Sequence, residues 1–258
     1  MKKNNIIVTD FRDSLFVSQK YEKYTVEEAD GILTVFGSGR IIEDKFRGPD
    51  KQVLVSLMNL ADDLMAEAKR YEAINSGHDK KSFTCSCVPT IDGIIKHDHG
   101  ALLNWMGHDE ACQKLILSWC DKYGLPVEEA RPGSGFELEP FLCQLFKLNK
   151  NFNEWINDPP ESKTFKYVMS GRLIYDIDII DGVPEMTIVF PSVLDLARLQ
   201  LSLTMCNPSD SETVIQCQVC SRWFVGNSRM KYCGDPCNKM TAYRKRKKEE
   251  EADQGVKA

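Results

Sequence analysis

Apolar side chains recur at intervals of three and four residues in three separate stretches of the chain. The first runs from Asp50 to Ile74, the second from Asp109 to Tyr123, and the third from Leu138 to Ile156. This spacing places the apolar residues on one face of a helix, so we expect three amphipathic helices. Gly124 directly follows the second and is its expected stop. A break is expected in the third near Asn149.

Other stretches alternate between apolar and polar residues, which is typical of strands. Two short strands are expected near the start of the chain, at "NNIIVTDF" (4–11) and "GILTVFG" (31–37). The run from Tyr167 to Phe190 alternates on both sides of "DGVPE" and predicts a hairpin. A further helix is expected over "SVLDLARLQLSLTM" (192–205), whereas "IIKHDHG" (94–100) and "RPGSGFELEP" (131–140) are expected to be a turn and a loop.

The composition is ordinary for a globular protein. The chain has 258 residues, of which 42% are hydrophobic and 28% charged. No apolar run approaches the roughly 20 residues that span a bilayer, and the first residues lack a signal-peptide core. We therefore expect a cytoplasmic protein that engages no membrane. Its ten cysteines are then not expected to form disulfides, which leaves metal ligation or simple burial.

Four of these cysteines have the spacing of a zinc site. Cys217 and Cys220 form C-x2-C, and Cys233 and Cys237 form C-x3-C after twelve intervening residues. Two close pairs present four thiolates to one tetrahedral Zn²⁺, and four ligands leave no open position, so the metal is expected to be structural. Burial without a metal is the simpler alternative. A redox C-x-x-C is the other, but no βαβ unit surrounds it.

The residues between and after the two pairs predict a local fold. "RWFV", a turn at "GNS" and "RMKY" suit a short hairpin between the pairs. Asp235 is the expected N-cap of a following helix, Pro236 its first residue, and Cys237 lies just inside it. A knuckle, a hairpin and a helix together are the plan of a treble-clef finger.

These elements predict the domain organisation. Residues 1–206 are expected to form an α+β body, mostly helical with antiparallel hairpins. Residues 207–213 are a linker, 214–251 a small C-terminal treble-clef zinc finger with a basic helix, and 252–258 a flexible tail. The body is expected to sense a ligand, to form a homodimer, or to engage a protein partner; the sequence leaves these alternatives open.

Charge is distributed unevenly between the body, the finger and the tail. The net charge is −5, yet residues 217–248 hold nine Lys or Arg and one Asp, a local balance of +8, which leaves −10 on residues 1–216 and −3 on the tail. A basic module on an acidic body favours a polyanionic partner. We expect nucleic acid, with phosphate contacts from the basic residues. These are Arg222, Arg229, Lys231, Lys239, Arg244, Lys245, Arg246, Lys247 and Lys248.

The finger resembles the C-terminal zinc finger of bacterial CGNR-type proteins, which are transcriptional regulators. The pattern is C-x2-C, an aromatic residue, Y-C-x3-C and then R-x-R, carried here by Cys217, Cys220, Phe224, Tyr232, Cys233, Cys237, Arg244 and Arg246. The name-giving tetrapeptide departs from the family pattern, because it reads Cys237-Asn238-Lys239-Met240 here. The resemblance covers about forty-five C-terminal residues. It implies nucleic-acid binding by the finger and effector sensing by the body.

The leading hypothesis is a DNA-binding transcriptional regulator, with RNA as the weaker alternative. A second hypothesis is an adaptor whose finger docks an acidic protein, and a third is an enzyme with an accessory finger. The chain has no nucleophile elbow, metalloprotease helix, Walker loop or full dinucleotide fingerprint, so we expect no enzyme.

A second metal site is the remaining candidate. Cys85 and Cys87 form C-x-C, and His97 and His99 form H-x-H ten residues later. Thiolates and imidazoles are suitable ligands for soft metals. A surface loop and ordinary burial are the alternatives, and the sequence does not decide between them. Four other cysteines lie on apolar helical faces and are expected in the core: Cys112, Cys120, Cys143 and Cys206.

Overall fold

The structure is a computed structural model that describes residues 15–47, 51–75, 98–126, 135–157, 174–180, 183–189, 192–206 and 213–255. The chain divides into two compact units, Met1–Leu201 and Ser202–Ala258. The described residues contain six helices and two sheets. The predicted α+β class, a mostly helical body with a small cysteine module after it, is confirmed.

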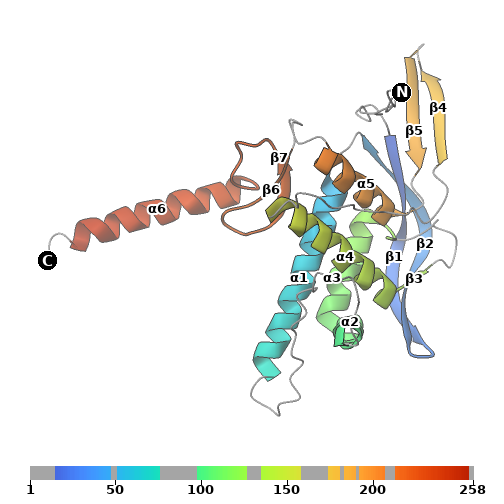
Figure 1. Ribbon diagram of the computed structural model, residues 1–258, viewed down its shortest axis with the longest axis horizontal. Helices are drawn as coiled ribbons and strands as arrows, with labels where there is room; N and C mark the ends of the chain where they lie inside the picture. The colour runs from blue at the N-terminus through green and yellow to red at the C-terminus, as the bar shows by residue number, and fades with distance from the viewer. Residues whose placement is uncertain are drawn as a thin grey trace, which may run out of the picture. The chain divides into compact units, whose positions relative to one another are not determined.

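The first unit is built on a mixed five-stranded sheet (Figure 1). In spatial order its strands are β3 (Gly135–Glu137), β2 (Ile32–Arg47), β1 (Leu15–Ala29), β5 (Val183–Val189) and β4 (Ile174–Ile180). Neighbouring strands are antiparallel except β1 and β5, which pair in parallel over three residues. The hairpin expected around "DGVPE" is confirmed as β4 and β5.

The long β1–β2 hairpin turns at Asp30 and Gly31, whose φ angles are 52° and 76°. Two successive positive φ values define the type I′ turn, whose twist matches that of the flanking strands, and Asp-Gly favours this turn. Further along, Gly37 lies under the buried ring of Tyr21, where a Cβ atom would overlap the ring. The absent side chain of Gly37 therefore lets Tyr21 pack flat across the strands.

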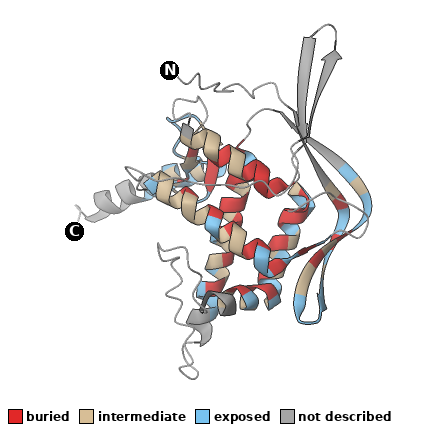
Figure 2. Ribbon diagram, turned by 45° about the vertical axis from the view of Figure 1, so that its right-hand side comes forward, coloured by how far each residue is buried: buried red, intermediate tan, exposed pale blue. Residues whose placement is uncertain are grey.

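Five helices are associated with this sheet: α1 (Gln52–Asn75), α2 (Asp98–His108), α3 (Glu110–Tyr123), α4 (Leu138–Asn157) and α5 (Val193–Cys206). The sheet contacts α3 through β1, and α4 through β2 and β3, while α1 packs on α3 and α4. Figure 2 shows the buried positions concentrated on the helices. The largest fully buried side chains include Leu57 and Met58 of α1 and Phe141 and Phe152 of α4.

Local signals set the ends of α3. The Asp109 side chain accepts a hydrogen bond from the Cys112 N–H at 2.9 Å, and the Gly124 N–H donates to the Cys120 carbonyl at 2.8 Å. Gly124 has a φ of 88°, a conformation that glycine adopts without strain. The stop predicted at Gly124 is confirmed.

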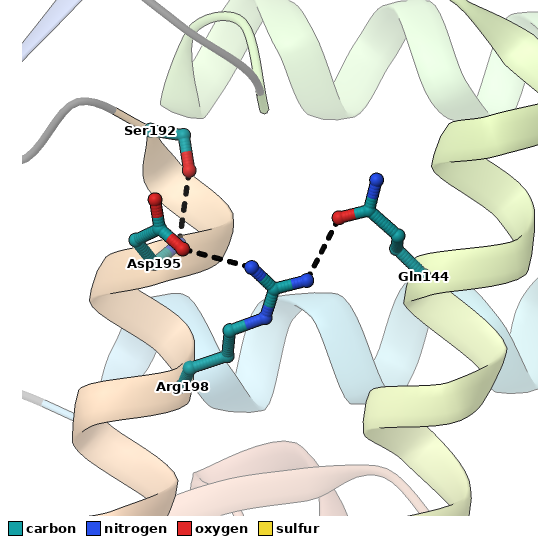
Figure 3. Close-up of polar contacts among 4 residues, drawn as sticks. All are labelled: Gln144, Ser192, Asp195 and Arg198. Carbon is teal, nitrogen blue, oxygen red and sulfur yellow. Dashed lines mark hydrogen bonds and ion pairs between the residues drawn. The ribbon is translucent and has the colours of Figure 1, made fainter. Parts of the chain in front are cut away.

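A buried polar network fixes the start of α5 (Figure 3). The Ser192 hydroxyl accepts from the Asp195 N–H at 3.0 Å and caps the helix. Asp195, whose side chain is 0% exposed, pairs with Arg198 at 2.8 Å. Arg198 also donates to Gln144 of α4 at 2.7 Å. These contacts tie α5 to α4 through one guanidinium, whose planar fork suits two partners at once.

A second buried contact ties α5 to α1. The Gln200 side-chain oxygen accepts from the Leu54 N–H at 2.8 Å, and both residues are at most 2% exposed. The first N–H groups of a helix have no partner within the helix. Gln200 therefore acts as a capping group for α1, supplied from 146 residues away along the chain.

Three expectations were wrong. Helix α4 is continuous past Asn149, because the Asn153 amide donates to the Asn149 backbone and side-chain oxygens at 3.0 and 2.9 Å and satisfies the polar groups there. The loop at 131–140 contains β3 and the start of α4, and the turn at 94–100 contains the start of α2. The strand expected at 4–11 lies outside the described residues, and the one at 31–37 is part of the much longer β2.

Candidate metal centre

The four cysteines of the predicted zinc site come together in the second unit. Their sulfur atoms all lie within 4.8 Å of one another. The Cys233 sulfur is 3.6 Å from that of Cys220 and 3.6 Å from that of Cys237. A tetrahedron with Zn–S bonds of about 2.3 Å has edges of about 3.8 Å. The cluster therefore has the dimensions of a four-thiolate metal site, whereas a disulfide would hold its sulfurs at about 2 Å.

The first cysteine pair occupies the turn of a small hairpin formed by β6 (Thr213–Gln216) and β7 (Trp223–Gly226). The Cys217 N–H donates to the Arg222 carbonyl at 2.9 Å, and the Ser221 N–H donates to the Cys217 carbonyl at 2.9 Å. Ser221 has a φ of 58°. This left-handed residue tightens the turn, so that both sulfurs of the C-x2-C pair face the same point.

The strand pairing within the finger differs from the prediction. β7 pairs with β6, which precedes the first cysteine pair, and not with "RMKY". The reason lies in burial: Val214 on β6 and Trp223 and Phe224 on β7 are each at most 9% exposed, whereas the first three residues of "RMKY" are exposed. The segment after β7 instead makes a turn, in which the Met230 N–H donates to the Asn227 carbonyl at 2.9 Å.

The second cysteine pair lies at the start of α6 (Asp235–Gly255). Cys237 is in the first turn, as predicted, but the helix begins one residue earlier than expected. The Asn238 N–H donates to the Gly234 carbonyl at 3.1 Å, so Gly234 holds the N-cap position and Asp235 is already helical. The prediction of Asp235 as the N-cap was wrong, because the helical hydrogen bonding already begins at the Gly234 carbonyl, and glycine is an accepted N-cap residue.

The pKa of the Cys217 thiol is lowered, whereas the pKa values of Cys233 and Cys237 are raised. Burial raises the pKa of the Cys217 thiol, but N–H groups of Cys220, Val219 and Cys233 donate to the sulfur and bring this pKa down to about 6. The hydrogen bond with Cys233, followed by burial, raises the pKa of Cys237 to about 12. Burial is the main cause that raises the pKa of Cys233. A thiolate at Cys217 beside protonated Cys233 and Cys237 follows from these shifts, and a divalent cation would favour the loss of the protons from both neighbours.

The residues predicted to contact nucleic acid lie on three parts of the second unit: the cysteine turn, the turn after β7, and α6. Six of them are exposed, namely Arg222, Arg229, Lys231, Lys239, Arg244 and Lys247. Lys245, Arg246 and Lys248 belong to α6, but their side chains are outside the described residues. The exposed basic residues therefore lie on the segments that carry the cysteines, and on α6 they continue up to ten residues beyond Cys237.

Sequence reasoning missed three exposed apolar residues beside these cations. Met230, Met240 and Tyr243 are 40%, 46% and 57% exposed. A signal for part of this set was present in the sequence: Lys239, Tyr243 and Lys247 follow one another at steps of four, the spacing of a single helical face.

The second candidate metal site stays a prediction. Cys85, Cys87 and His97 lie outside the described residues, and His99 lies in the first turn of α2 with its side chain outside them. Within the ranges that the structure describes, Cys217, Cys220, Cys233 and Cys237 are the one group found with ligand atoms this close. Of the four other cysteines, Cys112 and Cys120 are buried as expected, Cys143 is half-buried, and the side chain of Cys206 is outside the described residues.

Comparison with protein-family models, with curated proteins and with solved structures finds no match. The resemblance to CGNR-type fingers therefore rests on the residues quoted above. No helix within the described part of the chain has the length and apolar character needed to cross a membrane.

Proposed function

We propose that this chain is a zinc-finger protein that binds nucleic acid, and that it acts as a DNA-binding transcriptional regulator. The observation that carries the proposal is the set of exposed Arg and Lys residues on the segments that a closed four-cysteine cluster joins. Four thiolates in a tetrahedron are the preferred environment of structural zinc, and they leave no position for a substrate. Cys217, Cys220, Cys233 and Cys237 would hold the ion, and the ion would hold the basic segments in place.

Charge supports this choice of partner. Residues 217–248 carry +8, and a Zn²⁺ with four thiolates adds −2, so the finger retains about +6. Its exposed cations belong to separate segments that the cysteine cluster joins. Charges on several segments can contact several phosphates together, which is the main source of affinity in non-specific DNA binding.

The body has a different role in this proposal. Residues 1–206 serve as a sensing or association domain of a cytoplasmic regulator, not as an enzyme. The resemblance of the finger to bacterial CGNR-type regulators supports this division. The acidic body, with −10 over residues 1–216, has no electrostatic attraction for DNA, so the finger would supply the contact surface.

The test is binding of zinc-loaded full-length protein to labelled duplex DNA, measured by fluorescence anisotropy between 50 and 200 mM salt. A variant with Arg229, Lys231 and Lys239 replaced by Gln removes three exposed finger cations. The logarithm of the binding constant should fall less steeply with the logarithm of salt, by up to about 2.7 in slope for three lost phosphate contacts.

The matched control replaces three exposed body cations by Gln: Lys69, Arg70 and Lys114. It should bind as the unmodified protein does. Absence of DNA binding at 50 mM salt would refute the proposal, and an acidic protein partner would then become the leading hypothesis.

A further inference from the structure

Two of the exposed apolar side chains of the second unit lie on α6, among its cations. Of the described residues, six large apolar side chains are exposed, and Tyr243 is the most exposed of them at 57%. Met240, three residues earlier on α6, is 46% exposed. A helix that only kept the finger in solution would need no aromatic residue at such a position. Tyrosine is enriched at interfaces because its ring is apolar and its hydroxyl forms hydrogen bonds, so an exposed ring between cations suits a recognition surface.

Helical geometry places these residues on one side of α6. Each residue turns the helix by about 100°, so Lys239, Tyr243 and Lys247 follow a line that drifts by only about 40° per four-residue step. Tyr243 is turned by about 240° from Cys237, and Met240 lies within about 60° of Tyr243. Lys239 and Tyr243 therefore face away from the metal ligand, while Met240, three residues after Cys237, lies at the edge of this surface about 60° from that ligand. We call the surface formed by Lys239, Met240, Tyr243 and Lys247 the α6 ridge.

We propose that the α6 ridge enters the major groove of duplex DNA, where Tyr243 contacts base edges while Lys239 and Lys247 contact phosphates. This inference rests on the proposed function and adds the form of nucleic acid and the residue that contacts the bases. The major groove is about 12 Å wide and admits one helix, whereas the minor groove is about half as wide.

The chemistry of the ridge favours this partner over a phosphate-only contact. The two lysines lie one turn to either side of Tyr243, about 6 Å along the axis in each direction. A phosphate-binding surface needs cations alone. The phenol ring and the Met240 thioether add an apolar surface that matches a thymine methyl group, and the phenol hydroxyl adds a hydrogen bond to a base edge.

A duplex is favoured over a single strand by the shape of the module. Surfaces that bind single strands present several aromatic side chains along a groove or open sheet, on which successive bases stack. In the two-stranded sheet of the finger, Trp223 and Phe224 are buried, and α6 presents one aromatic ring on a convex surface. One convex helix with a single exposed ring suits a groove better than a series of unstacked bases.

The acidic end of α6 limits how far the helix enters. Glu249, Glu250 and Glu251 follow the last lysine directly and would be repelled by phosphates. From Lys239 to Lys248 the helix rises about 14 Å, which corresponds to about four base pairs. We therefore expect a short footprint from each finger, with the helix leaving the groove at the glutamates.

The experiment uses the zinc-loaded full-length protein, a 20-base-pair duplex selected from a random pool, and one strand of the same duplex. Tyr243→Ala should weaken binding to the duplex about tenfold, because a base contact is lost, and should leave the salt dependence unchanged, because no charge is lost. Lys247→Gln should instead lower the slope of affinity against salt. Tyr71→Ala, at an exposed tyrosine of α1, is the control and should bind normally.

Methylation protection gives the second readout. Dimethyl sulfate modifies guanine N7 in the major groove, so bound protein should protect N7 over about four consecutive base pairs. Zinc content is measured for each variant to verify that the finger is intact. Unchanged affinity of Tyr243→Ala, exposed guanine N7 in the complex, or a stronger effect of Tyr243→Ala on the single strand would each overturn the ridge assignment. In all three cases salt-dependent binding by the unmodified protein would leave the proposed function standing.

Discussion

Replacement of Cys217 by serine should unfold the finger and leave the body folded. Cys217 is 1% exposed and its sulfur is one of the four in the cluster. The finger has little else to hold it: Val214, Trp223 and Phe224 are its buried apolar side chains outside the cysteine cluster among the described residues. Burial of a large apolar side chain contributes about 2 kcal/mol. Zinc contributes about 10–16 kcal/mol in comparable modules, so loss of the metal exceeds what the apolar residues supply.

Hydrogen–deuterium exchange with mass spectrometry measures both units in one sample. In Cys217→Ser, amides of 213–226 should exchange as fast as in an unfolded peptide, while those of α1, α3 and α4 keep their protection. Zinc content should fall to zero. Cys143→Ser is the matched control, because Cys143 is a free, half-buried cysteine of α4 outside the cluster, and it should retain zinc and protection in the finger. Full zinc content together with slow exchange at 213–226 in Cys217→Ser would refute the four-ligand assignment.

Three further predictions concern the body. Phe152→Ala, at a fully buried position, should lower the free energy of unfolding by about 3–5 kcal/mol in urea titration, and a loss below 1 kcal/mol would contradict the packing described. Asp195→Asn should cost about 3 kcal/mol, because it leaves the half-buried Arg198 guanidinium without its carboxylate; calorimetry showing unchanged stability would contradict this. Burial raises the pKa of Cys112 to about 12 and that of Cys120 further, while an unfolded thiol ionises near 8.5. The buried thiol form therefore stabilises the fold below about pH 8.5, and this contribution falls as the pH rises toward 12. The urea concentration at the midpoint of unfolding should decrease across that pH range. A constant midpoint would contradict the burial of these two thiols.

The parts of the structure that sequence predicted are those set by local signals. A repeat of three and four residues marks the buried face of α1 and α3 because helix periodicity alone decides which side chains meet the core. Asp109 and Gly124 mark the ends of α3 for the same reason. The clustering of the four cysteines could be predicted, because two closely spaced pairs that share one tetrahedral metal ion can adopt few arrangements.

What sequence did not predict depends on contacts between distant residues. The pairing of β7 with β6 places Trp223 and Phe224 where both are buried, and spacing alone cannot choose between two possible partner strands. Strand β3 has three residues, too few to show alternation, and forms only because β2 offers an edge. The spacing of four placed Tyr243 between two lysines on one helical face, but its exposed fraction depends on what packs against α6, which the spacing does not show.

The parallel pairing of β1 with β5 has a consequence for how the protein is made. Leu15 pairs with Thr187, and the Leu54 N–H is capped by a residue 146 positions later. A ribosome releases the N-terminal hairpin first, yet one edge of β1 and the start of α1 must await nearly the whole body. Contacts between residues this far apart in the sequence slow folding, because a long loop must lose conformational entropy before they can form. The nascent body thus leaves the edge of β1 at Leu15–Val17 unpaired during synthesis, and completes its sheet only when β4 and β5 emerge.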